Sequence, residues 1–214
     1  MTRTMTLAAM AVAAACAAAA TGTAQPAAPK ADSAPAGVYA LDPAHSTVAF
    51  RVGHVGLSAF AAGFDKVSGQ LTFDPANPRA MRVEATIDVA SLDLPAPPAG
   101  FHDQLMGEAW FDAKRHPQMT FRSTKVEPTG PRTARVTGDL TLRGVTKPAV
   151  LEVTYNNGYA KGQMDPAANR IGFSGRATIN RSDYGMSYGV PAPGSNIGVA
   201  DKVEIALETE WTKN

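Results

Sequence analysis

Hydrophobic and polar residues alternate along most of this chain from Ser46 onward, with a period of two rather than 3.6. Alternation of this kind is typical of strands that bury only one face. We therefore predict about eight amphipathic strands, whose apolar faces fall within residues 48–52, 67–73, 81–89, 119–121, 134–142, 149–155, 171–179 and 203–211.

Clusters of Pro, Gly, Asn and Asp separate these segments and predict turns at residues 74–78, 128–131, 144–148, 156–158 and 191–194. Residues 99–112 follow a different pattern, because Phe101, Leu105 and Ala109 recur at helical spacing after a run of prolines. We expect a short helix there, bridging two strands.

Eight amphipathic strands must bury their apolar faces together, which predicts an all-β fold. An antiparallel β-barrel of about eight strands does this and leaves no open edge, and a two-sheet sandwich is the alternative. Small residues recur on the predicted inner faces: Ala85, Ala134, Gly138, Ala149, Gly175 and Ala177. They leave volume that other side chains fill or a ligand occupies, so they indicate a cavity.

The amino terminus does not share this pattern. Arg3 is the one charged residue before an apolar run at 7–20, which is shorter than a membrane span needs. Small residues follow, so we predict a signal peptide over residues 1–24, cleaved after Ala24. The residues before Cys16 loosely resemble a lipoprotein cleavage box but lack its usual Leu. We therefore favour cleavage after Ala24 over lipidation at Cys16. Residues 25–37, rich in Ala and Pro, are expected to form a flexible leader, and 38–214 the barrel domain.

Charge argues against two classes of partner. The chain has 20 Lys and Arg against 19 Asp and Glu. Removal of the signal peptide takes away Arg3 and no acidic residue, so the mature protein is close to neutral. It carries no basic block, which argues against binding nucleic acid or an anionic membrane surface. It also lacks cysteine after cleavage, so neither a disulfide nor a catalytic thiol is expected.

The residue types that usually carry chemistry are scattered. The four histidines, His45, His54, His102 and His116, show no metal-ligand spacing, and we predict no metal site. We expect His45 to bind backbone where the first strand opens. There is no nucleophile elbow or phosphate loop, so no catalytic residue and no enzyme activity are predicted. If the protein were an enzyme, His45, His102 and Asp183 would be the residues to test.

The glycine-rich segment 180–198 places Tyr184, Met186 and Tyr188 in a loop after a strand. Aromatic and Met side chains at a barrel mouth suit a lid over an apolar ligand. A tyrosine corner or ordinary loop packing fits the same residues.

Several stretches together resemble the YceI-like family of exported lipid-binding proteins. The best match is "GDLTLRGVTKP" at 138–148, and "LDPAHSTVAFRVGHVGLSAFAAGF" at 41–64 is similar to the family's start. "LTFDPANP", "WFDAKRHPQMTFRSTKV" and "ADKVEIALETE" match further segments, so the likeness covers about residues 38–211. The chain departs from the family between 92 and 112, where it is less charged and richer in proline.

The resemblance implies a lipocalin-like barrel that is periplasmic or secreted and holds a polyisoprenoid, such as a prenyl carrier lipid or a quinone tail. The ligand is a partner rather than a cofactor, and no cofactor is expected. A homodimer through an exposed strand is compatible with the sequence. An enzyme acting on a prenyl-lipid head group and a barrel without ligand that serves interactions are the alternatives. The side chains expected to line the lumen are Val48, Phe50, Leu71, Phe73, Ala85, Ile87, Phe101, Leu105, Phe121, Gly138, Leu140, Ala149, Leu151, Phe173, Gly175, Ala177, Tyr184, Met186 and Tyr188.

Overall fold

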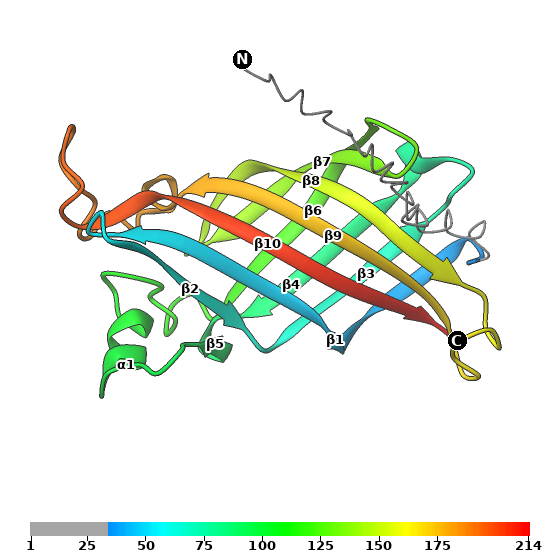
Figure 1. Cartoon of the computed structure of the whole chain (residues 1–214), viewed down its shortest axis with the longest axis horizontal. Coiled ribbons are helices and arrows are strands. Elements are labelled where there is room, and N and C mark those ends of the chain that lie inside the picture. Colours follow the sequence, from blue (N-terminus) through cyan, green and yellow to red (C-terminus); the bar gives the residue numbers. More distant parts are fainter. Residues whose placement is uncertain (1–33) are drawn as a thin grey trace, which may run out of the picture. The chain divides into compact units, whose positions relative to one another are not determined.

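The computed structural model describes residues 34–214, which form an antiparallel β-barrel with very little helix (Figure 1). The predicted signal peptide and most of the predicted leader lie outside the described residues. The strands are β1 (Gly37–His54), β2 (Ser58–Phe64), β3 (Val67–Phe73), β4 (Arg82–Asp88), β5 (Leu92–Asp93), β6 (Gln118–Pro128), β7 (Thr133–Leu142), β8 (Val145–Tyr159), β9 (Asn169–Asn180) and β10 (Val199–Lys213). One α-helix, α1 (Phe101–Met106), and three 3₁₀ turns, Pro78–Ala80, Val89–Ser91 and Arg181–Tyr184, complete the described part.

Eight of these strands form a closed ring. The order β10-β9-β8-β7-β6-β4-β3-β1 is continuous, and β10 also pairs with β1, so the sheet meets itself. At this seam Val48 faces Leu207 and Val52 faces Val203 across the strands. The predicted barrel is therefore confirmed, and the sandwich alternative is excluded.

Strand β1 pairs with two other strands besides β10. Its beginning, Gly37–Ala40, pairs with β3, and its later part, Val48–His54, pairs with β2. Between them the pairing with β10 shifts register from Asp42 to Thr47. A bulge of this kind bends a strand and lets one strand contribute to two parts of a wall.

Two strands were not predicted, β2 and the two-residue β5 that pairs with it. In β2 the inward side chains Phe60, Ala62 and Phe64 alternate with Ala and Gly rather than with polar residues. Period-two contrast is therefore absent. β1 also begins nine residues earlier in the chain than the alternation indicated, at Gly37 rather than Ser46.

Two predicted turns need correction. Residues 156–158 lie inside β8, where the pairing with β9 shifts register between Tyr155 and Asn157, so the Asn-Asn-Gly run marks a bulge. The hairpin between β7 and β8 turns at Arg143 and Gly144 alone, both at positive φ, and Pro148 already belongs to β8. Two residues at positive φ are what a tight hairpin turn requires.

The predicted helix is shorter than 99–112. α1 ends at Met106, and the amide of Gly107 donates to the carbonyl of Gln104. Leu105 is buried and anchors the helix to the barrel. No helix in the described part of the chain is long and apolar enough to cross a membrane.

The core divides into two clusters toward opposite ends of β9. One lies beneath α1 and is formed by Ala62, Phe64, Val89, Leu92, Leu94, Leu105, Met119, Leu142, Tyr184 and Met186. The other is formed by Ala34, Tyr39, Leu41, Val67, Leu71, Phe73, Ile171 and Trp211. Figure 1 shows α1 at one end of the barrel and the carboxyl terminus at the other.

Candidate binding cavity

A cavity of about 660 Å³ lies inside the barrel. All eight strands of the ring contribute to its wall, and almost all of the side chains that line it are aliphatic or aromatic. Protein sites for small molecules have volumes of about 300–1,000 Å³ and are mostly apolar. The lumen is therefore large enough for a ligand and chemically suited to an apolar one.

Most of the residues predicted to line the lumen do line this cavity, and their contact with a ligand stays a prediction. They are Val48, Phe50, Leu71, Ala85, Ile87, Phe101, Leu105, Phe121, Leu140, Ala149, Leu151, Phe173, Gly175, Ala177 and Met186. Ala134, another of the small inward residues, lines it as well. The alternation in the sequence thus indicated the inner wall strand by strand.

Four predicted residues do not line the cavity. Phe73 is buried in the second core cluster, with its ring stacked on Tyr155. Gly138 lies beneath the Phe121 ring, which would collide with any side chain at that position. Tyr184 is 2% exposed within the cluster beneath α1, and Tyr188 is 60% exposed, with its ring against Trp110.

The wall also contains residues that the prediction missed. The inward side chains of β10 are Val203, Ile205 and Leu207, and their alternation with charged residues was a sufficient signal. Trp110 and Arg181 come from irregular segments, 107–117 and the 3₁₀ turn after β9, where no period reports which way a side chain points.

Arg181 is a buried cation in this apolar wall, with 3% of its surface exposed. Its Nη1, Nη2 and Nε donate to the carbonyls of Met186 (2.6 Å), Val199 (2.8 Å) and Ala200 (3.0 Å). Burial lowers the pKa of the guanidinium because water no longer solvates its charge. These bonds tie the turn after β9 to the β9–β10 loop and to the beginning of β10.

Trp110 lies against this guanidinium, whose carbon is 5.2 Å from the centre of the indole ring. The indole Nε1 is buried and has no hydrogen-bond partner within residues 34–214. Buried polar atoms are rarely left unpaired, so this donor needs an explanation.

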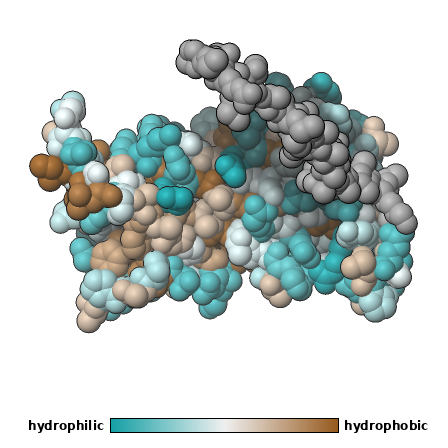
Figure 2. Space-filling model, in the orientation of Figure 1, coloured by the Kyte–Doolittle hydropathy of each residue, from teal (hydrophilic) through white to brown (hydrophobic). Residues whose placement is uncertain are grey.

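The same end of the barrel is apolar on its outside. Figure 2 shows hydrophobic residues gathered at the left end of the molecule, where Figure 1 places the β1–β2 turn and the β9–β10 loop. Leu57 in that turn is 86% exposed and Ile197 in that loop is 81% exposed. The two segments touch, since the amide of Val55 donates to the carbonyl of Gly198.

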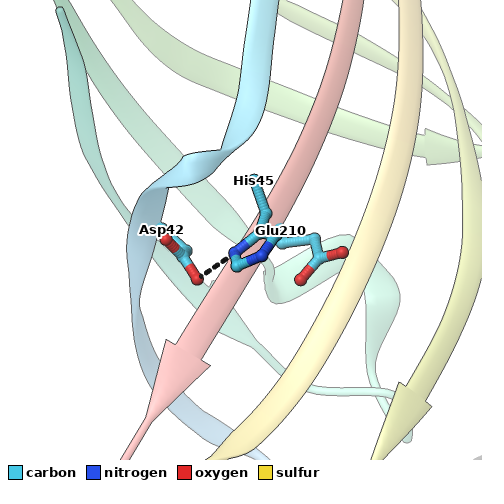
Figure 3. Close-up of side chains that lie close together, drawn as sticks. All are labelled: Asp42, His45 and Glu210. Atoms are coloured by element: carbon cyan, nitrogen blue, oxygen red, sulfur yellow. Dashed lines mark hydrogen bonds and ion pairs between the residues drawn. The ribbon is translucent and has the colours of Figure 1, made fainter.

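The group of His, Asp and Glu side chains that could hold a metal ion in the described part of the chain lies elsewhere. Asp42 and His45 from β1 and Glu210 from β10 converge at the seam (Figure 3). His45 Nδ1 is 2.9 Å from the Asp42 carboxylate, so this histidine pairs with a side chain rather than with the backbone as we expected. None of the three lines the cavity.

An arginine already occupies the cationic position of this cluster. Arg170 Nη1 donates to Asp42 at 2.8 Å and to Glu210 at 3.0 Å, and its Nε donates to Asp165. Arg170, and after it His45, lower the pKa of Asp42 to about 2 because they stabilise its ionised form. Asp42, His45 and Glu210 offer ligand atoms close enough for a metal ion, but the guanidinium neutralises the same carboxylates. The cluster therefore fits a structural clamp across the seam.

The residues named for a possible enzyme are not assembled. His45 belongs to the seam, His102 is on α1 beside Asp103, and Asp183 is in the 3₁₀ turn after β9. Within residues 34–214, neither His102 nor Asp183 belongs to a group that could hold a metal ion, and none of the three lines the cavity.

Comparison with known proteins gives the same fold and a family. The chain is 36% identical over 142 residues to a UPF0312 protein of Pseudomonas savastanoi, covering 66% of this chain and 71% of the relative. Its structure is similar to that of BcnA from Burkholderia cenocepacia, with a TM-score of 0.67, 32% identity, and coverage of 79% and 98% of the two chains.

A more distant structural neighbour is a polyisoprenoid binding domain from Saccharophagus degradans implicated in plant cell wall breakdown. Its TM-score is 0.60 at 14% identity, with coverage of 82% of this chain and 98% of that domain, so the likeness is one of fold. The family model described as the YceI-like domain matches residues 39–211, from the first strand to the last. This match and the curated relative together show that the chain belongs to the YceI-like family.

Proposed function

We propose that this protein binds a long isoprenoid lipid, such as a polyprenyl carrier or a quinone tail, inside its barrel, and carries or sequesters it. The observation that carries the proposal is the apolar cavity of about 660 Å³. The description of the Saccharophagus domain as polyisoprenoid binding supports the choice of lipid, because it names such a ligand for a barrel of this fold.

The cavity volume bounds how much lipid it holds. An apolar cavity of about 150 Å³ accepts one benzene molecule, so about 660 Å³ holds about four such pieces, or about 25 carbon atoms. Each buried methylene contributes about 0.8 kcal/mol, so a prenyl chain of this length binds tightly without any reaction. A longer chain extends beyond the cavity.

The lining favours a binding protein over an enzyme. Its titratable side chains are His54, Arg82 and Arg181, and no Asp, Glu, Cys or Lys of the described residues lines the cavity. Acid–base catalysis on a lipid head group by paired carboxylates therefore has no candidates in this wall. A barrel packed solid for interactions alone would not contain a cavity of this size.

We also propose that the protein works outside the cytoplasm, in the periplasm or secreted. The support is the predicted signal peptide at residues 1–24, which lies outside the described residues. A soluble carrier in such a compartment would shield an isoprenoid chain from water.

The test is to identify what the protein holds. Protein purified from its own host is analysed by native mass spectrometry, and its lipids are extracted and identified. After delipidation it is offered a defined prenyl lipid. We expect one prenyl lipid per barrel and rebinding of the offered lipid. Protein that is uniformly empty, and that binds no prenyl lipid after delipidation, overturns the proposal.

A further inference from the structure

Besides His54 and Ser58, two hydrogen-bond donors interrupt the apolar wall at the end of the cavity beneath α1. They are the guanidinium of Arg181 and the indole Nε1 of Trp110, which come from the 3₁₀ turn after β9 and from the segment after α1. Arg181 lies over the Trp110 ring, so the two groups share one corner. The corner is next to Tyr188, which is largely exposed, so it lies toward solvent.

The donors of this corner exceed its acceptors. An arginine side chain has five N–H groups, and three of them are directed to the carbonyls of Met186, Val199 and Ala200. Each nitrogen of Arg181 thus has one acceptor, whereas the Nε1–H of Trp110 has none within residues 34–214. Donors buried in this way are stabilised only when an acceptor reaches them.

The positive charge of Arg181 also has no paired carboxylate within residues 34–214. The acidic residue that acts on the Arg181 charge is Asp201, and its two carboxylate oxygens accept bonds from the amide and the hydroxyl of Ser182. Backbone carbonyls carry only partial charge. A buried cation without a paired carboxylate favours a ligand with negative or strongly polarised oxygen.

We propose that Arg181 and Trp110 bind the polar end of the lipid, and that this end is an acceptor-only group, either a quinone-type carbonyl or a phosphate. The inference rests on the proposed function, since it places the head group of the lipid whose chain fills the lumen. A phosphate or a carbonyl accepts from these donors and adds no donor of its own. An alcohol adds a hydrogen that neither Arg181 nor Trp110 can accept, and an ammonium group is repelled by Arg181.

The alternative is that Arg181 only fixes the β9–β10 loop, which its three carbonyl bonds also achieve. Trp110→Phe separates the two roles. It removes the Nε1 donor and keeps an aromatic face for the guanidinium, so the loop contacts of Arg181 are retained. Trp211→Phe is the matched control, because Trp211 lines the other end of the cavity and its Nε1 already donates to Thr209.

The experiment measures the affinity of the full mature chain, after delipidation, for four probes that share one tetraprenyl chain. The probes end in a phosphate, a benzoquinone, an alcohol, or no head group. We expect the wild type to bind the phosphate or the quinone at least about tenfold tighter than the hydrocarbon and the alcohol. Preference for the phosphate identifies an anionic head group, and preference for the quinone identifies a neutral carbonyl.

We expect Trp110→Phe to reduce this preference by about tenfold while the hydrocarbon still binds, which also shows that the variant is folded. Trp211→Phe is expected to weaken all probes together and to keep the preference. Equal wild-type affinities for all probes, or an unaltered preference in Trp110→Phe, overturn the head-group inference and leave the proposed function standing. Failure of all four probes to bind overturns the proposed function instead.

Discussion

Replacing Ala177 by Trp distinguishes a hollow barrel from a packed one. Ala177 lies on β9 and lines the cavity, where it pairs with Ile205 of β10. An indole is somewhat larger than benzene, which needs about 150 Å³, so it fills about a quarter of the cavity. The structure provides this volume without moving the wall.

We therefore expect Ala177→Trp to leave the free energy of unfolding unchanged or to raise it by about 1–2 kcal/mol through burial of the indole. In a packed core, the same enlargement costs about 1–3 kcal/mol or more. Lipid binding is expected to fall, because the indole displaces about one isoprene unit of five carbons. At about 0.8 kcal/mol per carbon this is about 4 kcal/mol, or roughly a thousandfold in affinity.

The assays are thermal unfolding and titration with a prenyl lipid. Thr178→Trp is the matched control, because Thr178 is the next residue on the same strand and points outward. It is expected to change neither quantity. An Ala177→Trp unfolding temperature lowered by more than about 5 °C refutes the hollow lumen at this position. Unaltered lipid affinity shows that the ligand does not pass Ala177.

Four further predictions follow from single features. Gly138→Ala should lower the free energy of unfolding by about 2–4 kcal/mol, because its Cβ would overlap Phe121 and lie 2.6 Å from a backbone oxygen. Gly175→Ala is the control and should cost less than about 1 kcal/mol, because the nearest neighbour of its Cβ is the flexible end of a leucine at 3.3 Å. Equal losses of the two variants in denaturant titrations would contradict this. The pKa of Asp42 is about 2 in the folded protein against an ordinary value of 3.8, so Asp42 contributes stability that is fully present above pH 4 and lost as the pH falls through 2. Asp42→Asn should remove at most about 2 kcal/mol of this pH dependence in acid titrations. An unchanged slope of the free energy of unfolding against pH would count against the Arg170 clamp. Chelators should leave thermal unfolding unchanged, whereas a clear rise of the unfolding temperature on adding Zn²⁺ would show that the seam cluster holds a metal in preference to its arginine. Intact-mass measurement of exported protein should give a chain that starts at Gln25, and a lipidated start at Cys16 would overturn the cleavage site.

The strands of the ring could be predicted because each has one face toward solvent and one face toward the apolar interior. Along β9, the residues from Ile171 to Ile179 alternate cleanly, and Gly175 and Ala177 were placed on the inner wall by period alone. β2 could not be predicted in this way, because Ala and Gly occupy the positions where polar residues would mark the outer face.

The polar parts of the structure could not be predicted in the same way. Arg181 and Trp110 lie in irregular segments, so their meeting at 5.2 Å depends on the path of two loops. The clamp at the seam joins Asp42 to Arg170, which are 128 residues apart in the sequence. Contacts of this kind depend on which strands become neighbours, and no local pattern reports that.

The seam between β1 and β10 also bears on how the barrel folds. It pairs the first strand with the last, and the Ser46 hydroxyl donates to the carbonyl of Glu210 across a separation of 164 residues. Contacts between such distant residues slow folding, because a long loop must close before they form. Until β10 is available, the edges of β1 and β9 are unpaired and can recruit other chains. A nascent or truncated chain that lacks β10, Val199–Lys213, is therefore an open sheet with two unpaired edges, and the barrel closes only when this strand is present.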